Sequence, residues 1–203
     1  MNSARILLMR HGRIAPQVPW RFVGQRDLPM DETGRRQAQL VRERLRNIEI
    51  GRIVSSDLGR AMETARIVAA GRDLTIEAEP ALREIHLGDW EGLSVNEVQA
   101  AFPGEYERRG RDLEGVRPAG GESFRDLLDR VLPVFEALAA GPAPSTLIVA
   151  HAGVNRVILC HLLGMPLSNL LGLGQDYGCL NVIGATSGRR RLDLLNLPPG
   201  APL

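Results

Sequence analysis

The stretch Ile6-Leu7-Leu8-Met9-Arg10-His11-Gly12 decides the fold of this chain of 203 residues. Its apolar run is short and lies near the start of the chain, which is typical of a fully buried strand. The run ends in an arginine, a histidine and a glycine, and a glycine lets the backbone turn tightly because it has no Cβ. In open α/β sheets, ligands bind at the carboxyl ends of the strands. We therefore expect Arg10 and His11 to emerge at a functional site.

The composition excludes several classes of protein. The charged fraction of 24% is ordinary for a globular domain, and the net charge of +1 gives no indication of a nucleic-acid or membrane partner. None of the 25 basic residues is a lysine. This excludes a Walker-type phosphate loop and a lysine Schiff base, and any anion site must use arginines, imidazoles and backbone N–H groups. The spacing of Cys160 and Cys179 does not match that of metal ligands, so we expect both to be buried thiols. We also expect a cytoplasmic protein.

Strand and helix patterns alternate along the chain. A loop at 13–30 precedes Asp31, the expected N-cap of a helix, and Ser94 with Glu97 forms a capping box for another. This alternation predicts an α/β fold with an antiparallel edge at its C-terminal end. Apolar or alternating runs predict strands at 52–56, 75–78, 146–150, 180–185 and 190–195. Helical patterns predict a helix that begins after Asp31, one through Arg60, one after Ser94, one at 123–140 and one that follows Gly153 and ends at Leu163. The last two strands flank a probable turn at Ser187-Gly188.

Polar clusters follow three of the predicted strands. Arg10-His11 follows the first, residues 55–60 follow the second and His151 follows the fourth. Strand ends on one side of a sheet converge, so these residues could share a pocket suited to a phosphoryl group. Arginines bind its oxygens in pairs, and a neutral imidazole can attack phosphorus to form a phosphohistidine. An Arg-His-Gly triplet alone would more often be an ordinary turn, and it is the later clusters that favour a site.

Six motifs resemble those of the histidine phosphatase superfamily, on its phosphoglycerate mutase-like branch. Their order and spacing match from residue 5 to about 196. They are Leu8–Gly12, Gly24 with Asp27 and Pro29, Gly34 with Gln37-Ala38, Ser55 through Arg60 to Thr64-Ala65, Glu84 with Gly88–Gly92, and Ala150–Gly153.

The resemblance implies a three-layer α/β/α sandwich around a mostly parallel six-stranded sheet. It implies that His11 is the phosphorylated nucleophile and that Arg10, Arg60 and His151 hold the phosphoryl group. Glu84 would protonate the leaving oxygen and then deprotonate the attacking water. We expect residues 1–203 to form a single domain, with a probable insertion or mobile cover at 104–121.

Further residues are candidates for binding the substrate. Gln17 stands where the family often has asparagine, and Val23 replaces a common hydroxyl residue before Gly24. Ala152 follows the second histidine where another branch has aspartate, which leaves Glu84 as the acid. The full set of expected substrate-binding residues is Gln17, Trp20, Arg21, Gly24, Gln25 and Ala152.

The short segment between Glu84 and His151 favours a phosphatase over a mutase, because it leaves little chain for a cover that excludes water. The C-terminal part resembles α-ribazole-phosphate phosphatases of cobalamin biosynthesis. We therefore expect a phosphomonoester hydrolase acting on a small phosphorylated metabolite, with α-ribazole phosphate as a candidate. The alternatives are a phosphoglycerate mutase, a fructose-2,6-bisphosphatase-like enzyme, and a non-catalytic phosphate-binding module.

Other readings of the polar residues are less favoured. Two histidines and a carboxylate could bind a metal, but the neighbouring arginines would repel it, so we expect neither metal nor cofactor. Arg108, Arg109 and Arg111 are expected on a solvated face, with contact to a phosphate substrate as the alternative. Thr64, in the middle of a predicted helix, is expected to be a packing residue. Glu91 is expected to shape its loop. A homodimer is one possible assembly.

Overall fold

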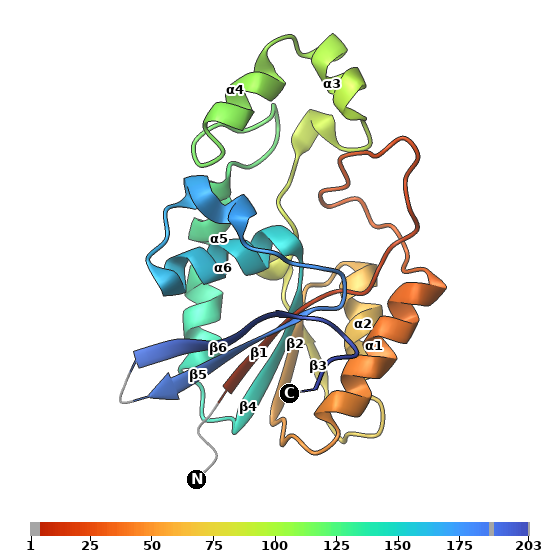
Figure 1. The fold of residues 1–203 in the computed structure, drawn as a ribbon, viewed down its shortest axis with the longest axis vertical. Helices are drawn as coiled ribbons and strands as arrows, with labels where there is room; N and C mark the ends of the chain where they lie inside the picture. Colours follow the sequence, from red (N-terminus) through yellow and green to blue (C-terminus); the bar gives the residue numbers. More distant parts are fainter. Residues whose placement is uncertain (1–4, 187–188, 203) are drawn as a thin grey trace.

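A mixed sheet of six strands organises the computed structural model, which describes residues 5–186 and 189–202 (Figure 1). The order is β3-β2-β4-β1-β5-β6. The first four of these strands run parallel, whereas β5 is antiparallel to both β1 and β6. The predicted fold class is therefore confirmed, including the antiparallel edge, while Ser187-Gly188 lies outside the described residues. The strands are β1 (Arg5–Arg10), β2 (Arg52–Ser55), β3 (Ile76–Ala78), β4 (Ser145–Ala150), β5 (Leu180–Thr186) and β6 (Arg189–Leu197).

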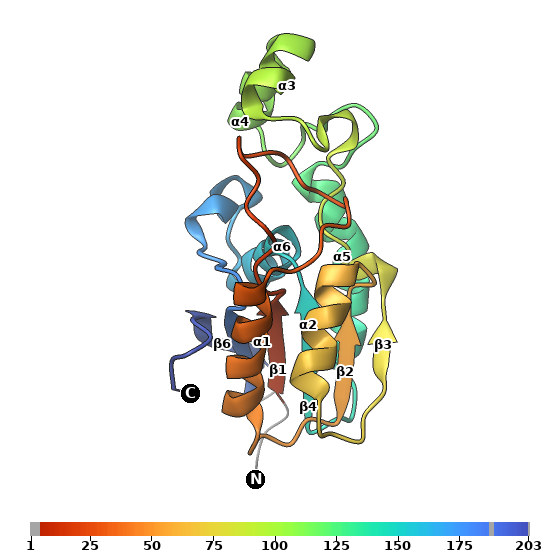
Figure 2. The same cartoon turned by 90° about the vertical axis from the view of Figure 1, so that its right-hand side faces the viewer.

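Helices cover both faces of the sheet and create two separate cores. Leu7 and Met9 of β1 pack on the side of α1 and α2, whereas Ile6 and Leu8 pack on the side of α5 and α6. Successive side chains of a strand point to opposite faces, so the continuous apolar run of β1 is buried on both. Figures 1 and 2 show the three layers. These helices are α1 (Glu32–Leu45), α2 (Gly59–Ala69), α5 (Phe124–Ala139) and α6 (Ala152–Leu163).

Helix ends follow the predicted signals. The Asp31 side chain accepts a hydrogen bond from the Gly34 amide at the start of α1. Ser94 and Glu97 form the expected capping box of α3 (Val95–Ala101). Gly164 ends α6 with a φ of 62°, a left-handed conformation that favours glycine. Local sequence therefore fixes where these helices begin and end. Three short 3₁₀ helices complete the fold: η1 (Pro80–Leu82), η2 (Gly88–Trp90) and η3 (Leu167–Gly172).

Helices α3 and α4 (Glu105–Arg111) extend beyond the carboxyl ends of the strands (Figure 1). Arg109 is only 6% exposed, so the prediction that it lies on a solvated face is wrong. Its guanidinium donates to the carbonyls of Val116 and Glu122 and lies over the rings of Trp90 and Phe124. Burial lowers the pKa of Arg109 to about 10. Arg109 thus anchors the 104–121 segment to the rest of the fold.

Candidate active site

The carboxyl ends of β1, β2 and β4 place both histidines side by side. The His11 amide donates to the Ala150 carbonyl at 3.0 Å, and the Ser56 amide donates to the Val149 carbonyl at 2.9 Å, which extends the sheet past the strand ends. The ring centroids of His11 and His151 are 5.0 Å apart. The predicted convergence of these strand ends therefore occurs.

A hydrogen bond fixes the tautomer of His11. Its Nδ1 lies 2.8 Å from the carbonyl oxygen of Gly12, and because a carbonyl only accepts, Nδ1 carries the proton. The lone pair of the neutral ring is then on Nε2. Thr64 fixes the Gly12 peptide by accepting from its amide at 3.0 Å while donating to the Arg60 carbonyl at 2.7 Å. Thr64 is thus a buried packing residue of α2, as expected, and it also holds the residue that follows His11.

Both histidines are held in the neutral form. Burial, followed by the charges of Arg10 and Arg60, lowers the pKa of His11 well below its ordinary value. Burial also lowers the pKa of His151, with His11 and the same arginines adding to the effect. The hydroxyl of Ser56 lies 2.8 Å from Nε2 of His151. A neutral imidazole is the form that can act as a nucleophile.

Two arginines bring positive charge to the same place. Arg60 is 2% exposed, and its two terminal nitrogens donate to the carbonyls of Arg26 and Gly24 at 2.6 and 2.8 Å. Arg10 donates to the Gln175 carbonyl at 2.5 Å, and its guanidinium lies 3.7 Å from the ring centroid of Tyr177. Carbonyl and aromatic partners orient these cations without neutralising them.

Three buried nitrogens beside the cavity have unused hydrogen-bonding capacity. The Nε atoms of Arg10 and Arg60 and the Nδ1 of His151 have no hydrogen-bond partner in the described part of the chain. A buried polar atom without a partner costs about 1–3 kcal/mol, so such atoms need a reason. Two guanidiniums and an imidazole together suit an anion with several oxygens, such as a phosphoryl group.

Glu84 brings a carboxylate to the cavity. It lies between η1 and η2, and its two oxygens are 3.1 and 3.2 Å from the amide of Gly153, in the first turn of α6. Its Oε1 also accepts from the Ile85 amide at 2.9 Å. Glu84 tends to raise the pKa of Arg60, against the larger lowering by burial, so the two charges interact.

A cavity of about 200 Å³ opens beside these groups. Arg10, His11, Arg60 and Glu84 line one part of it, and apolar and aromatic side chains line the rest. Trp20 is 62% exposed, and its ring centroid is 4.9 Å from that of Phe22. The apolar and aromatic lining residues are Ile14, Trp20, Phe22, Val23, Ile85, Leu87 and Tyr177.

The expected substrate-binding residues divide into two groups. Trp20, Arg21 and Gly24 line the cavity, whereas Gln17, Gln25 and Ala152 are not among its lining residues. Gln17 donates to the nearby Ala15 carbonyl at 3.3 Å, and Gln25 donates to the Glu84 carbonyl at 2.9 Å. Gln25 therefore supports the Glu84 backbone. The direct substrate role of these three residues stays a prediction.

Sequence reasoning missed two parts of the site. Tyr177 lines the cavity, and its ring centroid is 5.5 Å from that of His11. The Gln175 side chain, which bonds Asn155 and Asn181 at 2.9 Å each, is fully enclosed with them. Both residues lie in an irregular segment after η3, which belongs to the C-terminal part that resembles α-ribazole-phosphate phosphatases, but this resemblance assigned no role to either residue. Glu91, in contrast, shapes its loop as expected by accepting from the amides of Gln25 and Leu87.

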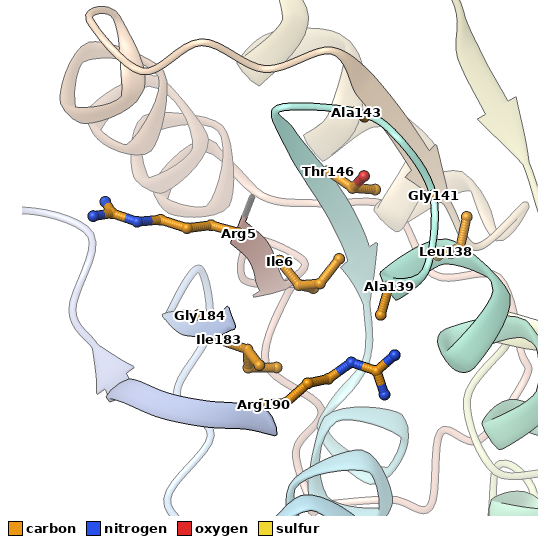
Figure 3. Close-up of a pocket in the computed structure, with 10 residues that line it drawn as sticks. All are labelled: Arg5, Ile6, Leu138, Ala139, Gly141, Ala143, Thr146, Ile183, Gly184 and Arg190. Carbon is orange, nitrogen blue, oxygen red and sulfur yellow. The ribbon is translucent and has the colours of Figure 1, made fainter. Parts of the chain in front are cut away.

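A second cavity, of about 40 Å³, lies at the opposite end of the strands and is bordered by β1, β4, β5, β6 and the end of α5 (Figure 3). Its described lining includes no histidine or carboxylate. Across residues 5–186 and 189–202, no three His, Cys, Asp or Glu side chains are grouped to hold a metal ion. No described helix has the length and apolar character to cross a membrane.

Known proteins are similar to this chain in sequence and structure. A glucosyl-3-phosphoglycerate phosphatase of Mycolicibacterium vanbaalenii is 37% identical over 86% of this chain and 80% of its own. An adenosylcobalamin/alpha-ribazole phosphatase of Salmonella typhimurium is 32% identical over 95% and 96%. The crystal structure of a putative alpha-ribazole-5'-P phosphatase from Escherichia coli matches with a TM-score of 0.88 and 28% identity, covering 96% of each chain.

The model of the histidine phosphatase superfamily, branch 1, matches residues 6–198, which include all three polar strand ends. The named relatives are phosphatases, and the match covers nearly the whole chain. The chain is therefore a phosphatase that belongs to branch 1 of the histidine phosphatase superfamily.

Proposed function

We propose that this phosphatase hydrolyses phosphomonoesters through a phosphohistidine formed on His11. The observation that carries the proposal is the hydrogen bond from Nδ1 of His11 to the Gly12 carbonyl, which leaves the Nε2 lone pair available beside two arginines. The same bond stabilises the positive charge that the ring gains when Nε2 bonds to phosphorus. Arg10, Arg60 and His151 bind the phosphoryl oxygens and offset their developing charge.

In the first step, Nε2 of His11 forms a bond to phosphorus while the bond from phosphorus to the leaving oxygen breaks. Protonated Glu84 gives its proton to that oxygen, so the alcohol leaves in neutral form. In the second step, the Glu84 carboxylate takes a proton from water, and the water oxygen bonds to phosphorus. The bond between nitrogen and phosphorus then breaks, its electrons return to Nε2, and inorganic phosphate leaves.

The reaction as proposed needs no metal ion or cofactor, because guanidinium groups supply the positive charge that metals supply in many phosphoryl-transfer sites. Arg60 is almost fully enclosed, so its charge acts in a region of low dielectric. Glu84 supplies the proton transfers. Each role in the two steps is thus filled by a side chain that lies at the cavity or directly beside it.

We propose a substrate with a bulky apolar or aromatic body, with α-ribazole phosphate as the leading candidate. The aromatic and aliphatic part of the cavity supports this proposal, as does the similarity to a relative named for alpha-ribazole. Arg21 lines the cavity but donates to the Gly92 carbonyl and to Glu97, so part of its charge is already compensated. A second anionic group on the substrate is therefore less favoured.

A phosphorylated sugar acid is the second candidate substrate. It is favoured by the relative named glucosyl-3-phosphoglycerate phosphatase and by the presence of Arg21 in the lining. Release of inorganic phosphate from a panel of phosphorylated metabolites, including both candidates and 3-phosphoglycerate, would rank these substrates by kcat/KM.

Covalent catalysis is tested with His11→Ala. The variant should lose turnover of p-nitrophenyl phosphate by several orders of magnitude, and acid-labile, base-stable radioactivity should be trapped only in the wild-type protein after incubation with a ³²P-labelled substrate. A His11→Ala variant that keeps wild-type turnover, or one whose activity depends on a chelatable metal, would disprove the mechanism. Binding of phosphate without turnover by the wild-type protein would instead indicate a non-catalytic module.

A further inference from the structure

An ion pair between Arg130 and Glu122 lies beside the backbone around Glu84. Arg130, on α5, donates from Nε and a terminal nitrogen to the two carboxylate oxygens of Glu122, at 2.8 and 2.7 Å. The side chains are 24% and 20% exposed, so the pair is largely shielded from solvent. A bidentate contact between an arginine and a carboxylate fixes orientation as well as distance.

The same two side chains hold the backbone on both sides of Glu84. Arg130 donates to the carbonyls of Ala81 and Arg83 at 2.7 and 3.1 Å, and more weakly to that of Glu84 at 3.4 Å. Glu122 accepts from the His86 amide at 2.8 Å through its carboxylate, and its own amide donates to the His86 carbonyl at 2.7 Å. The contacts therefore start three residues before Glu84 and end two residues after it.

No regular element includes Glu84 itself. It lies after the end of η1 at Leu82 and before the start of η2 at Gly88, so its backbone belongs to neither a strand nor a helix, although its carboxylate accepts from the Gly153 amide of α6. Neither Arg130 nor Glu122 is among the described residues that line the cavity. We infer that the ion pair between Arg130 and Glu122 positions Glu84 for proton transfer to the leaving oxygen, an inference that rests on the proposed function.

This role has a signature that a general structural role lacks. A displacement of about 1 Å in a reacting group can reduce a rate by about 100-fold. Proton transfer matters most when the leaving oxygen is strongly basic, because a weakly basic oxygen leaves without help. Loosening the Glu84 backbone should therefore slow the hydrolysis of alkyl phosphates much more than that of p-nitrophenyl phosphate, while the binding of phosphate at Arg10 and Arg60 is unchanged.

The experiment compares Arg130→Met with Arg125→Met as a matched control. Arg125 lies on the same helix and pairs with Glu114, but its side chain is 50% exposed, and neither side chain of this pair bonds the backbone of residues 81–86 in the described part of the chain. We expect Arg130→Met to lower kcat for an alkyl phosphate by about 10- to 100-fold and for p-nitrophenyl phosphate by less than about threefold. The inhibition constant for inorganic phosphate should not change, and the control should behave as wild type. Equal losses on both substrates would overturn the inference.

Glu122→Gln is the second variant, for the case in which Arg130→Met does not fold. The amide keeps an acceptor for the His86 amide but loses the charge and one acceptor for Arg130. It should show the same dependence on the leaving group to a smaller extent. Arg130→Lys, which keeps the charge but not the paired donors, should recover part of the alkyl phosphatase activity. A folded Glu122→Gln variant with equal losses on both substrates would overturn the inference.

Glu84→Gln separates failure of the inference from failure of the proposed function. If Glu84→Gln slows both substrates equally, Glu84 is not the acid, and the proposed function fails at that residue. If Glu84→Gln shows the leaving-group dependence and Arg130→Met does not, only the inference fails. In the double variant, Arg130→Met should add little further loss on the alkyl phosphate, because there is no longer an acid to position.

Discussion

His11 and His151 show how burial prepares a nucleophile. Each imidazole is almost fully enclosed and faces Arg10 and Arg60, so protonation would place a third positive charge in a region with little water. The same arginines attract the negative phosphoryl group. In the proposed mechanism, one arrangement of charge therefore keeps His11 unprotonated and holds the phosphoryl group that it attacks.

The depressed pKa of each histidine makes stability depend on pH. In the unfolded chain an imidazole titrates near pH 6.5, whereas in the folded protein the pKa values of His11 and His151 are well below this. Below about pH 6.5 the unfolded state therefore binds more protons, and folding stability falls as the pH falls. Each histidine contributes a slope of up to about 1.4 kcal/mol per pH unit.

Urea unfolding between pH 7.5 and 5, in phosphate-free buffer, measures this slope. His11→Asn should reduce it by up to about half, since one of the two buried imidazoles is removed. His161→Asn, which removes an imidazole with 41% of its side chain exposed, is the matched control. A wild-type free energy of unfolding that is constant over this range would contradict the prediction.

Thr64 carries a prediction about a single hydroxyl. Thr64→Val keeps the shape of the side chain but leaves the Gly12 amide without its acceptor and removes the hydroxyl that also donates to the Arg60 carbonyl. We expect a loss of about 1–3 kcal/mol in the free energy of unfolding. We also expect lower kcat, because Thr64 holds the amide of Gly12, the residue whose carbonyl fixes the tautomer of His11. Thr64→Ser keeps the hydroxyl and should retain most activity, whereas equal effects of both variants would show that only the methyl group matters.

The sequence predicted the residues at strand ends better than those in irregular segments. Arg10, His11 and His151 could be found because a short apolar run indicates a buried strand, and parallel strands end at one edge. Tyr177 and Gln175 depend on how the chain returns to this edge after η3, where no periodicity restricts its path. The role of Thr64 depends on its contact with Gly12, which is 52 residues away in sequence.

At the scale of elements, the 104–121 segment differs most from its expectation. Its composition favours a solvated cover, yet residues 105–111 form α4, and the aliphatic part and guanidinium of Arg109 lie against Trp90 and Phe124. Arginine is usually exposed, so the composition of this segment cannot show that Arg109 is buried while Arg108 and Arg111 are exposed. Tertiary packing decides this position.

Arg109→Ala should release this segment without unfolding the sheet. The variant loses hydrogen bonds to the carbonyls of Val116 and Glu122, and it opens a space between two aromatic rings. We expect faster hydrogen exchange and faster proteolysis within 104–121 than in wild type, with exchange in β1 and β4 unchanged. Arg108→Ala is the matched control, since 62% of that side chain is exposed. Equal exchange in both variants would contradict the anchoring role.

At the scale of the whole molecule, we propose that the chain is a single domain. Both cores use the same strands: β1, β2 and β4 contribute side chains to each. Neither helical layer can therefore lose its packing without exposing the sheet that the other layer needs. Urea unfolding followed by tryptophan fluorescence and by circular dichroism should give coincident single transitions. Two separate transitions would show that the layers unfold independently.

The cavity is also a property of the whole molecule, because distant segments build it. The loop after β1 supplies Trp20 and Phe22, the segment between η1 and η2 supplies Ile85 and Leu87, and the segment after η3 supplies Tyr177. The proposed mechanism places the phosphoryl group beside Arg10, His11, Arg60 and Glu84, which line one part of this cavity. The body of a substrate attached there must therefore lie against apolar and aromatic surfaces, and this favours a large hydrophobic body over a small sugar acid.

Trp20→Ala tests this preference. Burial of one aromatic face at about 25 cal/mol per Å² contributes on the order of 2 kcal/mol, which corresponds to about 30-fold in kcat/KM. We expect this loss for α-ribazole phosphate and almost none for 3-phosphoglycerate. Val18→Ala, in the same loop at a residue that is 92% exposed and outside the described lining, is the control. A wild-type preference for 3-phosphoglycerate or fructose 2,6-bisphosphate that survives Trp20→Ala would show that charge, and not the aromatic wall, selects the substrate.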